Sequence, residues 1–308
     1  MIGLQRGAFR LFRVAGIEVF LHWSWFIVAV VAIQQRREDY SSLVWNVAEY
    51  VALFVIVLLH EFGHALACRQ VGGQANRIIL WPLGGVAFVA PPQRPGATLW
   101  AIAAGPLVNV ILLPIALAAA LVGRWLGWGT AWPDMQGFLW AMVYINVGLL
   151  IFNLMPVYPL DGGQMLRAVL WFFIGRTRSL MVATTIGFVG AAGFVIFALD
   201  VESIWGGVMA LFLVMACWRG WRVARTLSLL EKMPRRPEFA CPSCQAGPPL
   251  GAFWVCHLCG TQFDTFETRA VCPKCQAQFP TTACAFCGES RPMAEWSRPA
   301  PLRPETRL

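Results

Sequence analysis

Six long apolar runs, separated by more polar segments, restrict what this chain of 308 residues can fold into. Each run approaches the roughly 20 apolar residues that a helix needs to cross the hydrocarbon core of a bilayer. Charged residues make up only 13% of the chain, about half the usual share in a soluble domain. We therefore expect an integral membrane protein with about six transmembrane helices, near residues 17–33, 47–68, 97–122, 137–155, 179–199 and 204–218.

Residues 71–96 interrupt the apolar runs, because they contain two Gly-Gly pairs and several prolines. Their alternating segments predict a short membrane-associated β segment, one or two strands with a turn at Gly84 and Gly85. Beside a protease site, such a strand could pair with an extended substrate by β-augmentation. A purely structural or lipid-facing hairpin is the equally open alternative.

Arginines are more frequent on one side of the expected bundle than on the other. They precede the first span, separate the second from the third and the fourth from the fifth, and follow the sixth. The positive-inside rule then places both termini in the cytoplasm of a bacterial or archaeal cell, and it accounts for the net charge of +8. The first span lacks a small-residue cleavage site, which favours an anchor over a cleaved signal peptide.

The second span contains the motif H-E-x-x-H as His60, Glu61 and His64. Histidines four positions apart lie on one face of a helix, so both imidazoles can hold one metal ion. Glu61 is beside the first histidine, where its carboxylate can take a proton from a metal-activated water. Ionisable residues inside a transmembrane helix are costly and mark functional sites, so we favour a catalytic centre over a chance pair of histidines.

A third metal ligand is predicted at Asp161, just beyond the fourth span. Pro156 and Pro159 end that helix, and a carboxylate past a broken helix end can project into a cavity. Asp161 could instead only cap the next helix, residues 162–174, but the histidine pair lacks an acidic partner and favours the ligand. His22 stays open between an interfacial aromatic belt and a place near the metal.

Eight of the ten cysteines form four C-x-x-C pairs, which indicates zinc binding in a reducing compartment. The pairs are Cys241/Cys244, Cys256/Cys259, Cys272/Cys275 and Cys284/Cys287. Eight thiolates suit two tetrahedral structural Zn²⁺ sites. Consecutive and interleaved combinations of the pairs both fit, and we favour the consecutive one. Cys68 and Cys217, in apolar helices, are expected to be buried thiols without a function.

These cysteines predict a small cytoplasmic domain over residues 241–290 that resembles a double zinc ribbon. A basic linker, residues 223–240, joins it to a membrane core of residues 1–222, and a disordered tail follows at 291–308. The domain either binds a protein partner or only stabilises itself. Several acidic residues dilute its positive charge, which argues against nucleic-acid binding.

Three motifs in chain order resemble those of the site-2 protease family of intramembrane zinc metalloproteases. They are H-E-F-G-H in the second span, G-P-L-V-N in the third and N-L-M-P-V-Y-P-L-D-G-G ending the fourth, and the resemblance covers roughly residues 15–220. By this resemblance His60, His64 and Asp161 bind one catalytic Zn²⁺ ion, and Glu61 activates the water. The family cleaves membrane-spanning segments of other proteins within the bilayer.

The resemblance also implies residues that support the site or the substrate. Asn109 matches the asparagine of the family's G-P-x-x-N motif, and Asn153 matches an asparagine near its active site. The segment with Gly84 and Gly85 resembles the family's membrane-associated sheet, which lines the substrate.

We therefore predict a zinc-dependent intramembrane endopeptidase, whose partners are the lipid bilayer and a substrate with a transmembrane segment. The alternative is a non-catalytic membrane scaffold that recruits partners through its zinc ribbons. A metal transporter is less favoured, because the other spans offer no buried acidic or histidine ligand beyond His22.

Overall fold

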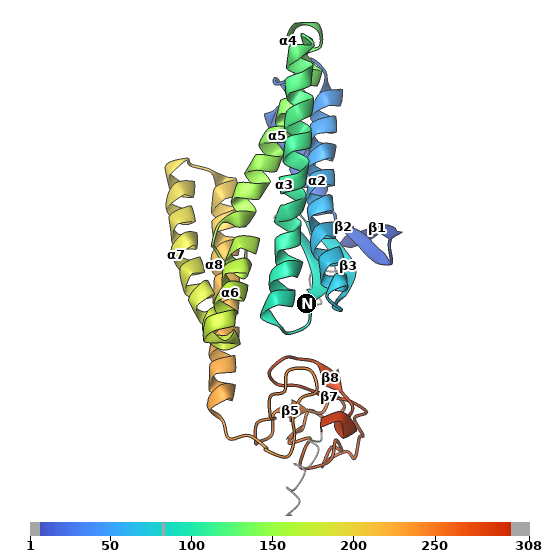
Figure 1. The fold of residues 1–308 in the computed structure, drawn as a ribbon, viewed down its shortest axis with the longest axis vertical. Helices are drawn as coiled ribbons and strands as arrows, with labels where there is room; N and C mark the ends of the chain where they lie inside the picture. Colours follow the sequence, from blue (N-terminus) through green and yellow to red (C-terminus); the bar gives the residue numbers. More distant parts are fainter. Residues whose placement is uncertain (1–6, 82–83, 297–308) are drawn as a thin grey trace, which may run out of the picture. The chain divides into compact units, whose positions relative to one another are not determined.

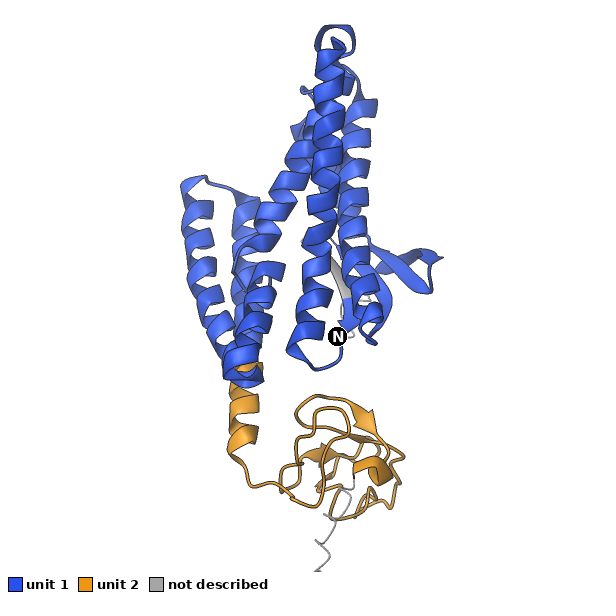
Figure 2. Ribbon diagram, in the orientation of Figure 1, with its two compact units in different colours: residues 1–221 blue, residues 222–308 orange. Residues whose placement is uncertain are grey.

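The computed structural model describes residues 7–81 and 84–296 (Figure 1). The chain divides into two compact units, residues 1–221 and residues 222–308, which Figure 2 shows in different colours. Each unit has its own hydrophobic clusters and is described by itself.

Helices make up most of unit 1, and the last of them continues past its end. They are α1 (Ser24–Gln35), α2 (Leu43–Gln70), α3 (Pro95–Trp125), α4 (Trp128–Ala131), α5 (Pro133–Leu154), α6 (Asp161–Ile174), α7 (Arg176–Asp200) and α8 (Ile204–Lys232). Among the described residues, α2, α3, α5, α7 and α8 are long and apolar enough to cross a membrane. The predicted class, a helical membrane protein with a small sheet, is confirmed with five such helices.

The first expected span, residues 17–33, is the one that the structure corrects. Ile17–His22 is strand β2, and α1 after it has only 12 residues. Ile17, Val19 and Leu21 are buried while the residues between them are partly exposed. This alternation with a period of two is the pattern of a strand with one covered face, and the overall apolarity of the segment conceals it.

A four-stranded sheet joins the two ends of the α1–α2 segment. Its strands are β1 (Ala8–Val14), β2, β3 (Gln74–Trp81) and β4 (Gly84–Ala90), in the order β1-β2-β3-β4. β2 and β3 run parallel, and the outer pairs are antiparallel. One sheet face packs on α2 in a cluster that includes Ile17, Leu80, Val57 and Ala65, which holds the second half of α2 against a rigid support.

Gly84 and Gly85 do not form the predicted turn. They begin β4, where they pair with Trp81 and Leu80 of β3. The hydrogen-bonded ladder therefore extends further than the glycines suggested, up to the pair Trp81 and Gly84. Residues 82–83 lie outside the described residues.

Unit 2 is built from two short hairpins and a single helical turn. The elements are β5 (Trp254–Val255) with β6 (Gln262–Phe263), β7 (Thr282–Ala283) with β8 (Ser290–Arg291), and η2 (Met293–Trp296). Trp296 is fully buried against Phe266, so residues 291–296 of the expected disordered tail are ordered. The rest of that tail, residues 297–308, lies outside the described residues. The first ten residues of the expected linker, 223–232, are part of α8.

A partly buried ion pair joins two distant segments of unit 2. Arg236 donates to Asp264 at 2.8 Å, and the backbone N–H groups of Gly251 and Phe266 donate to the same carboxylate at 3.0 Å. Burial alone raises the pKa of Asp264, but these donors outweigh it and hold that pKa below its ordinary value. The carboxylate therefore stays ionised, and its bonds fix the loops around it.

Replacing Trp296 by alanine tests the order of residues 291–296. Loss of this fully buried ring should destabilise unit 2 by about 3–5 kcal/mol. Hydrogen exchange of the whole protein, followed by mass spectrometry, should become faster in residues 239–296 and stay unchanged in α2 and α3. Trp125→Ala is the control, because that ring is 84% exposed. Unchanged exchange in unit 2 would show that Trp296 contributes little to its core.

Candidate metal centre

The second half of α2 carries two buried histidines on one face. His60 and His64 are one helical turn apart, and their Nε2 atoms lie 3.1 Å from each other. Their exposed fractions are 5% and 8%. Glu61, the next residue after His60, is also buried. The H-E-x-x-H motif is therefore enclosed by protein, as the apolar residues before it suggested.

Asp161, the first residue of α6, approaches this pair from a different part of the chain. Its Oδ2 atom lies 3.0 Å from His60 Nε2 and 3.3 Å from His64 Nε2. The N-cap position of α6 is Leu160, so Asp161 does not serve as the cap of this helix. One ligating atom from each of the three residues lies within 4.8 Å of the others. The fold thus brings together the three residues that the sequence singled out as ligands.

The hydrogen-bond partners of the two Nδ1 atoms fix the tautomers of His60 and His64. His60 Nδ1 lies 2.7 Å from Asn109 Oδ1, and His64 Nδ1 lies 2.9 Å from the carbonyl oxygen of Ala101. Both oxygens only accept hydrogen bonds, so each Nδ1 must carry a proton and donate it. In the neutral imidazoles each Nε2 is then an unprotonated lone pair. Both lone pairs face the space beside Asp161.

These three groups fit a zinc ion. Two lone pairs and a carboxylate oxygen meet at 3.0–3.3 Å in a buried site, where like partial charges repel strongly unless a cation lies among them. No hydrogen bond from a described residue satisfies the buried Oδ2 of Asp161. Tetrahedral ligands at about 2.0–2.1 Å from zinc are roughly 3.3 Å apart, and two histidines with one carboxylate leave a fourth position open.

Gly105 of α3 makes room for the histidine pair. A Cβ atom at this position would lie 2.8 Å from His60 Nε2 and closer still to the imidazole of His64. Real Cβ atoms essentially never make such contacts, so α3 can pass the site only with glycine there. Four residues later, the same helix supplies Asn109. The G-P-x-x-N motif therefore combines space for the two rings with an acceptor for one of them.

Asn146 is a member of this network that the sequence did not single out. It is buried on α5, and its Oδ1 accepts a hydrogen bond of 2.9 Å from Asn109 Nδ2. This contact orients the Asn109 amide so that its oxygen faces His60. The available signal was a lone amide within an apolar span, which must find a partner when it is buried.

Among the described residues, no hydrogen bond or ion pair joins the other residues singled out from the sequence to these three. Asn153 is half-buried on the last turn of α5, and its side chain makes no hydrogen bond to another described residue. His22 is in β2, where its Nδ1 lies 2.5 Å from Ser24 Oγ. Gly84 and Gly85 belong to β4, at one edge of the sheet. Their predicted support of the site remains a prediction.

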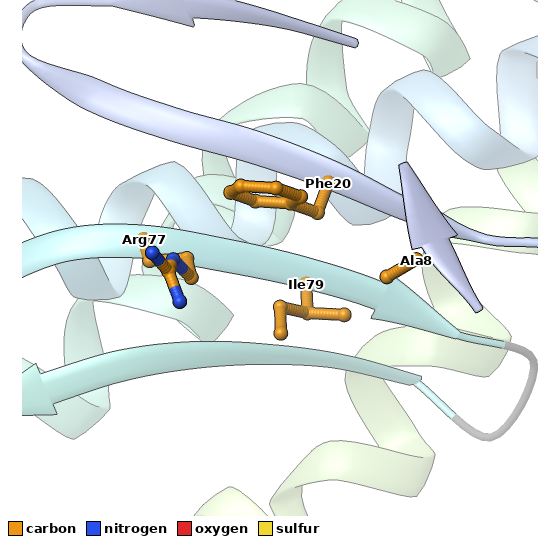
Figure 3. A pocket seen from close by; sticks show the side chains of 4 residues that line it. All are labelled: Ala8, Phe20, Arg77 and Ile79. Atoms are coloured by element: carbon orange, nitrogen blue, oxygen red, sulfur yellow. The ribbon is translucent and has the colours of Figure 1, made fainter. Parts of the chain in front are cut away.

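A separate hollow lies on the sheet, as Figure 3 shows. Ala8, Phe20, Arg77 and Ile79 line a space of about 180 Å³, and the Arg77 guanidinium is 4.9 Å from the centre of the Phe20 ring. None of the three grouped residues is among those that line it. We therefore place the chemistry at the buried group and not at this hollow.

The eight cysteines of unit 2 form two groups, but not in the expected combination. Cys241 and Cys244 join Cys284 and Cys287, while the four cysteines between them form the second group, Cys256, Cys259, Cys272 and Cys275. The second site is thus nested inside the first, and the consecutive and interleaved combinations are both wrong. The reason is tertiary: Ala240 donates to the carbonyl of Trp296 at 2.8 Å, so the segments on either side of the eight cysteines meet.

Both groups are suited to metal. In the outer group, Sγ atoms of facing pairs lie 3.7 Å apart, and in the inner group 3.5–3.6 Å. Hydrogen bonding from Cys284 lowers the pKa of the Cys244 thiol to about 5, and hydrogen bonds from Thr261 lower the pKa of Cys259 to about 6. Each group therefore holds a thiolate at neutral pH, the form that ligates metal.

Known proteins resemble this chain. The sequence profile of peptidase family M50 matches residues 48–127 and 128–197. A zinc metalloprotease of Methanocaldococcus jannaschii is 34% identical over 180 residues, which cover 58% of this chain and 50% of that protein. Stage IV sporulation protein FB of Bacillus subtilis is 27% identical over 154 residues, covering 49% of this chain and 46% of that protein. The chain thus spans about half the length of these relatives.

A solved structure shares the fold. The site-2 protease from Methanocaldococcus jannaschii superposes with a TM-score of 0.51 at 29% sequence identity. The match covers 70% of this chain and 95% of the other.

Replacing Gly105 by alanine should remove the metal from the buried group. The added Cβ displaces the imidazole of His64, so the purified protein should lose one zinc equivalent per chain in elemental analysis. Gly148→Ala is the matched control, because a Cβ on that glycine of α5 meets nothing within 4 Å. Wild-type zinc content in Gly105→Ala would contradict the assignment.

Proposed function

The membrane-spanning part of this chain belongs to peptidase family M50, and from that premise we propose that the protein is a zinc-dependent intramembrane endopeptidase. It cleaves membrane-spanning segments of other membrane proteins. The observation that carries this proposal is the group of His60, His64 and Asp161, buried among helices that are apolar enough to cross a membrane. Relatives named as zinc metalloproteases support Zn²⁺ as the metal.

The residues of the site have different roles in peptide hydrolysis. His60, His64 and Asp161 hold one catalytic Zn²⁺, which supplies the Lewis acidity that polarises the scissile carbonyl. Glu61 accepts a proton from the attacking water and passes it to the leaving amide nitrogen. Asn109 keeps His60 in the tautomer that can ligate. The apolar surroundings strengthen each of these electrostatic interactions.

The substrate segment must be extended before it can be cleaved, and β4 offers a place for it. As the terminal strand of its sheet, β4 has one edge that pairs with no other described strand. An extended peptide can hydrogen-bond to such an edge, with Gly84 and Gly85 allowing close approach of its backbone. Asn153 supports the same substrate from the end of α5.

The arginine distribution supports a topology with both termini in the cytoplasm of a bacterial or archaeal cell. His60 lies in the second half of α2 and Asp161 follows the end of α5. Both then lie toward the cytoplasmic side of the membrane, which suits release of a cleaved domain into the cytoplasm.

Unit 2 adds two structural Zn²⁺ ions and a surface for a protein partner. Val255 precedes Cys256 of the inner cysteine group and Leu258 precedes Cys259, and their side chains are 57% and 70% exposed. Exposed apolar side chains at neighbouring positions can form a contact surface. A scaffold without catalysis would use the same surface, but it would have no need for the buried group in unit 1.

Replacing Glu61 by glutamine tests the proposed reaction. Loss of the general base should lower cleavage by about 10²–10⁴-fold without removing zinc. Cleavage can be followed by mass spectrometry of a library of single-span peptides in liposomes. Glu38→Gln, a change at an exposed position, is the control and should cleave normally. A normal rate for Glu61→Gln would exclude this glutamate from the mechanism.

The nested cysteine groups make a second prediction, which zinc counting can test. Combining Cys241→Ser with Cys287→Ser should cost one zinc ion, because both changes affect the outer site. Combining Cys241→Ser with Cys256→Ser should cost two. Consecutive pairing of the knuckles would give the reverse result, so elemental analysis of the two double variants distinguishes the arrangements.

A further inference from the structure

The three grouped side chains depend on two different hydrophobic clusters. The histidines lie on α2, whose buried residues Val57 and Ala65 pack with the sheet. Asp161 follows Leu160, which belongs to a second cluster with Val157, Ala191 and Leu213. The residue before Asp161 therefore packs in a different cluster from the one that holds α2 against the sheet.

The loop before Asp161 is anchored on α7 through Val157. This side chain is 8% exposed and sits where Gly190 of α7 lacks a side chain. A Cβ on Gly190 would lie 3.2 Å from both Val157 Cβ and Cγ1, and closer than any real contact to Cγ2. Valine is stiff about χ1, so rotation cannot relieve this overlap and the loop itself would have to move.

Tyr158, the next residue, occupies a second gap, between α7 and α8. A Cβ on Gly187 of α7 would lie 3.1 Å from Tyr158 N and Cβ, and one on Gly220 of α8 would lie 2.8 Å from its ring. The Cys217 thiol of α8 donates to the Tyr158 carbonyl at 2.8 Å. Cys217 was expected to be a buried thiol without a function, yet it holds the loop that leads to Asp161.

Short-range hydrogen bonds make this loop stiff. Val157 N–H donates to Met155 O at 2.7 Å, and Leu160 N–H donates to Val157 O at 2.8 Å. The first turn of α6 packs directly on the backbone of residues 154–158. This close approach is possible because Gly162 and Gly163 have no side chains. A displacement of Val157 is therefore passed on to Asp161.

We infer that α7 and α8, from which none of the grouped side chains comes, position Asp161 through the Gly187, Gly190 and Cys217 contacts of the loop. α6, α7 and α8 appear together on one side of Figure 1. Metal affinity then depends on the packing of these helices as well as on the ligands. This inference rests on the proposed zinc site and adds positioning residues to it.

Gly190→Ala tests the inference in the full-length protein. A chelator titration should show zinc at the histidine site held about 10–100-fold more weakly, the range typical of residues that orient metal ligands. Gly193→Ala is the matched control one turn further along α7, where a Cβ meets nothing within 4 Å. The added change Val157→Ala removes the overlapping methyl groups and should restore affinity to within a few-fold of wild type. Wild-type affinity in Gly190→Ala, or failure of this rescue, would overturn the inference.

Cys217 provides a second variant if Gly190→Ala does not fold. Cys217→Ala removes the donor to Tyr158 and should weaken zinc binding, whereas Cys217→Ser keeps a donor and should retain it. Equal affinity in these two variants would count against the inference.

His64→Ala separates this test from that of the proposed function. Equal zinc content in wild type and His64→Ala would show that the histidine pair binds no zinc, and would contradict the proposed function. Loss of one zinc in His64→Ala, with Gly190→Ala unaffected, would overturn only the positioning role.

Discussion

Two hydrogen bonds on the outer side of a histidine pair determine what the centre of this fold can do. Asn109 and the Ala101 carbonyl accept from the Nδ1 atoms, which leaves both Nε2 atoms unprotonated and facing inward. In an apolar interior, two such lone pairs beside a carboxylate are unfavourable without a cation. The two acceptors that satisfy the buried Nδ1 groups therefore also keep the Nε2 atoms in the form that can bind a metal ion.

Glycines, which have no side chain, leave the space that the metal centre and the loop before Asp161 need. Gly105 lets α3 pass the imidazoles, and glycines of α7 and α8 receive the loop that carries Asp161. Small residues suit membrane helices, which associate through close packing because the lipid provides no hydrophobic driving force. Glycine inside a helix is destabilising by roughly 0.5–1 kcal/mol relative to alanine. Its presence at these contacts is consistent with a need for close approach.

Unit 2 is held together on a different physical basis. Its hydrophobic clusters are small, and the cysteines themselves form part of them, with Cys241 and Cys284 in one and Cys256 and Cys272 in the other. Trp254 packs against both clusters. Small domains with limited cores commonly depend on bound metal for stability, and the outer group would join the two segments that flank the inner group.

Local patterns in the sequence determined much of this protein. Helix periodicity places His60 and His64 on one face, apolar length indicates the long spans, and the C-x-x-C spacing brings each pair of cysteines together. Asp161 was also singled out from its broken helix end, and the structure brings it to the histidines. Strand β2, the nested cysteine groups, the Asn146 contact and the glycine gaps at Val157 and Tyr158 were decided only by the tertiary structure. Each depends on contacts between segments far apart in the chain, which local spacing cannot specify.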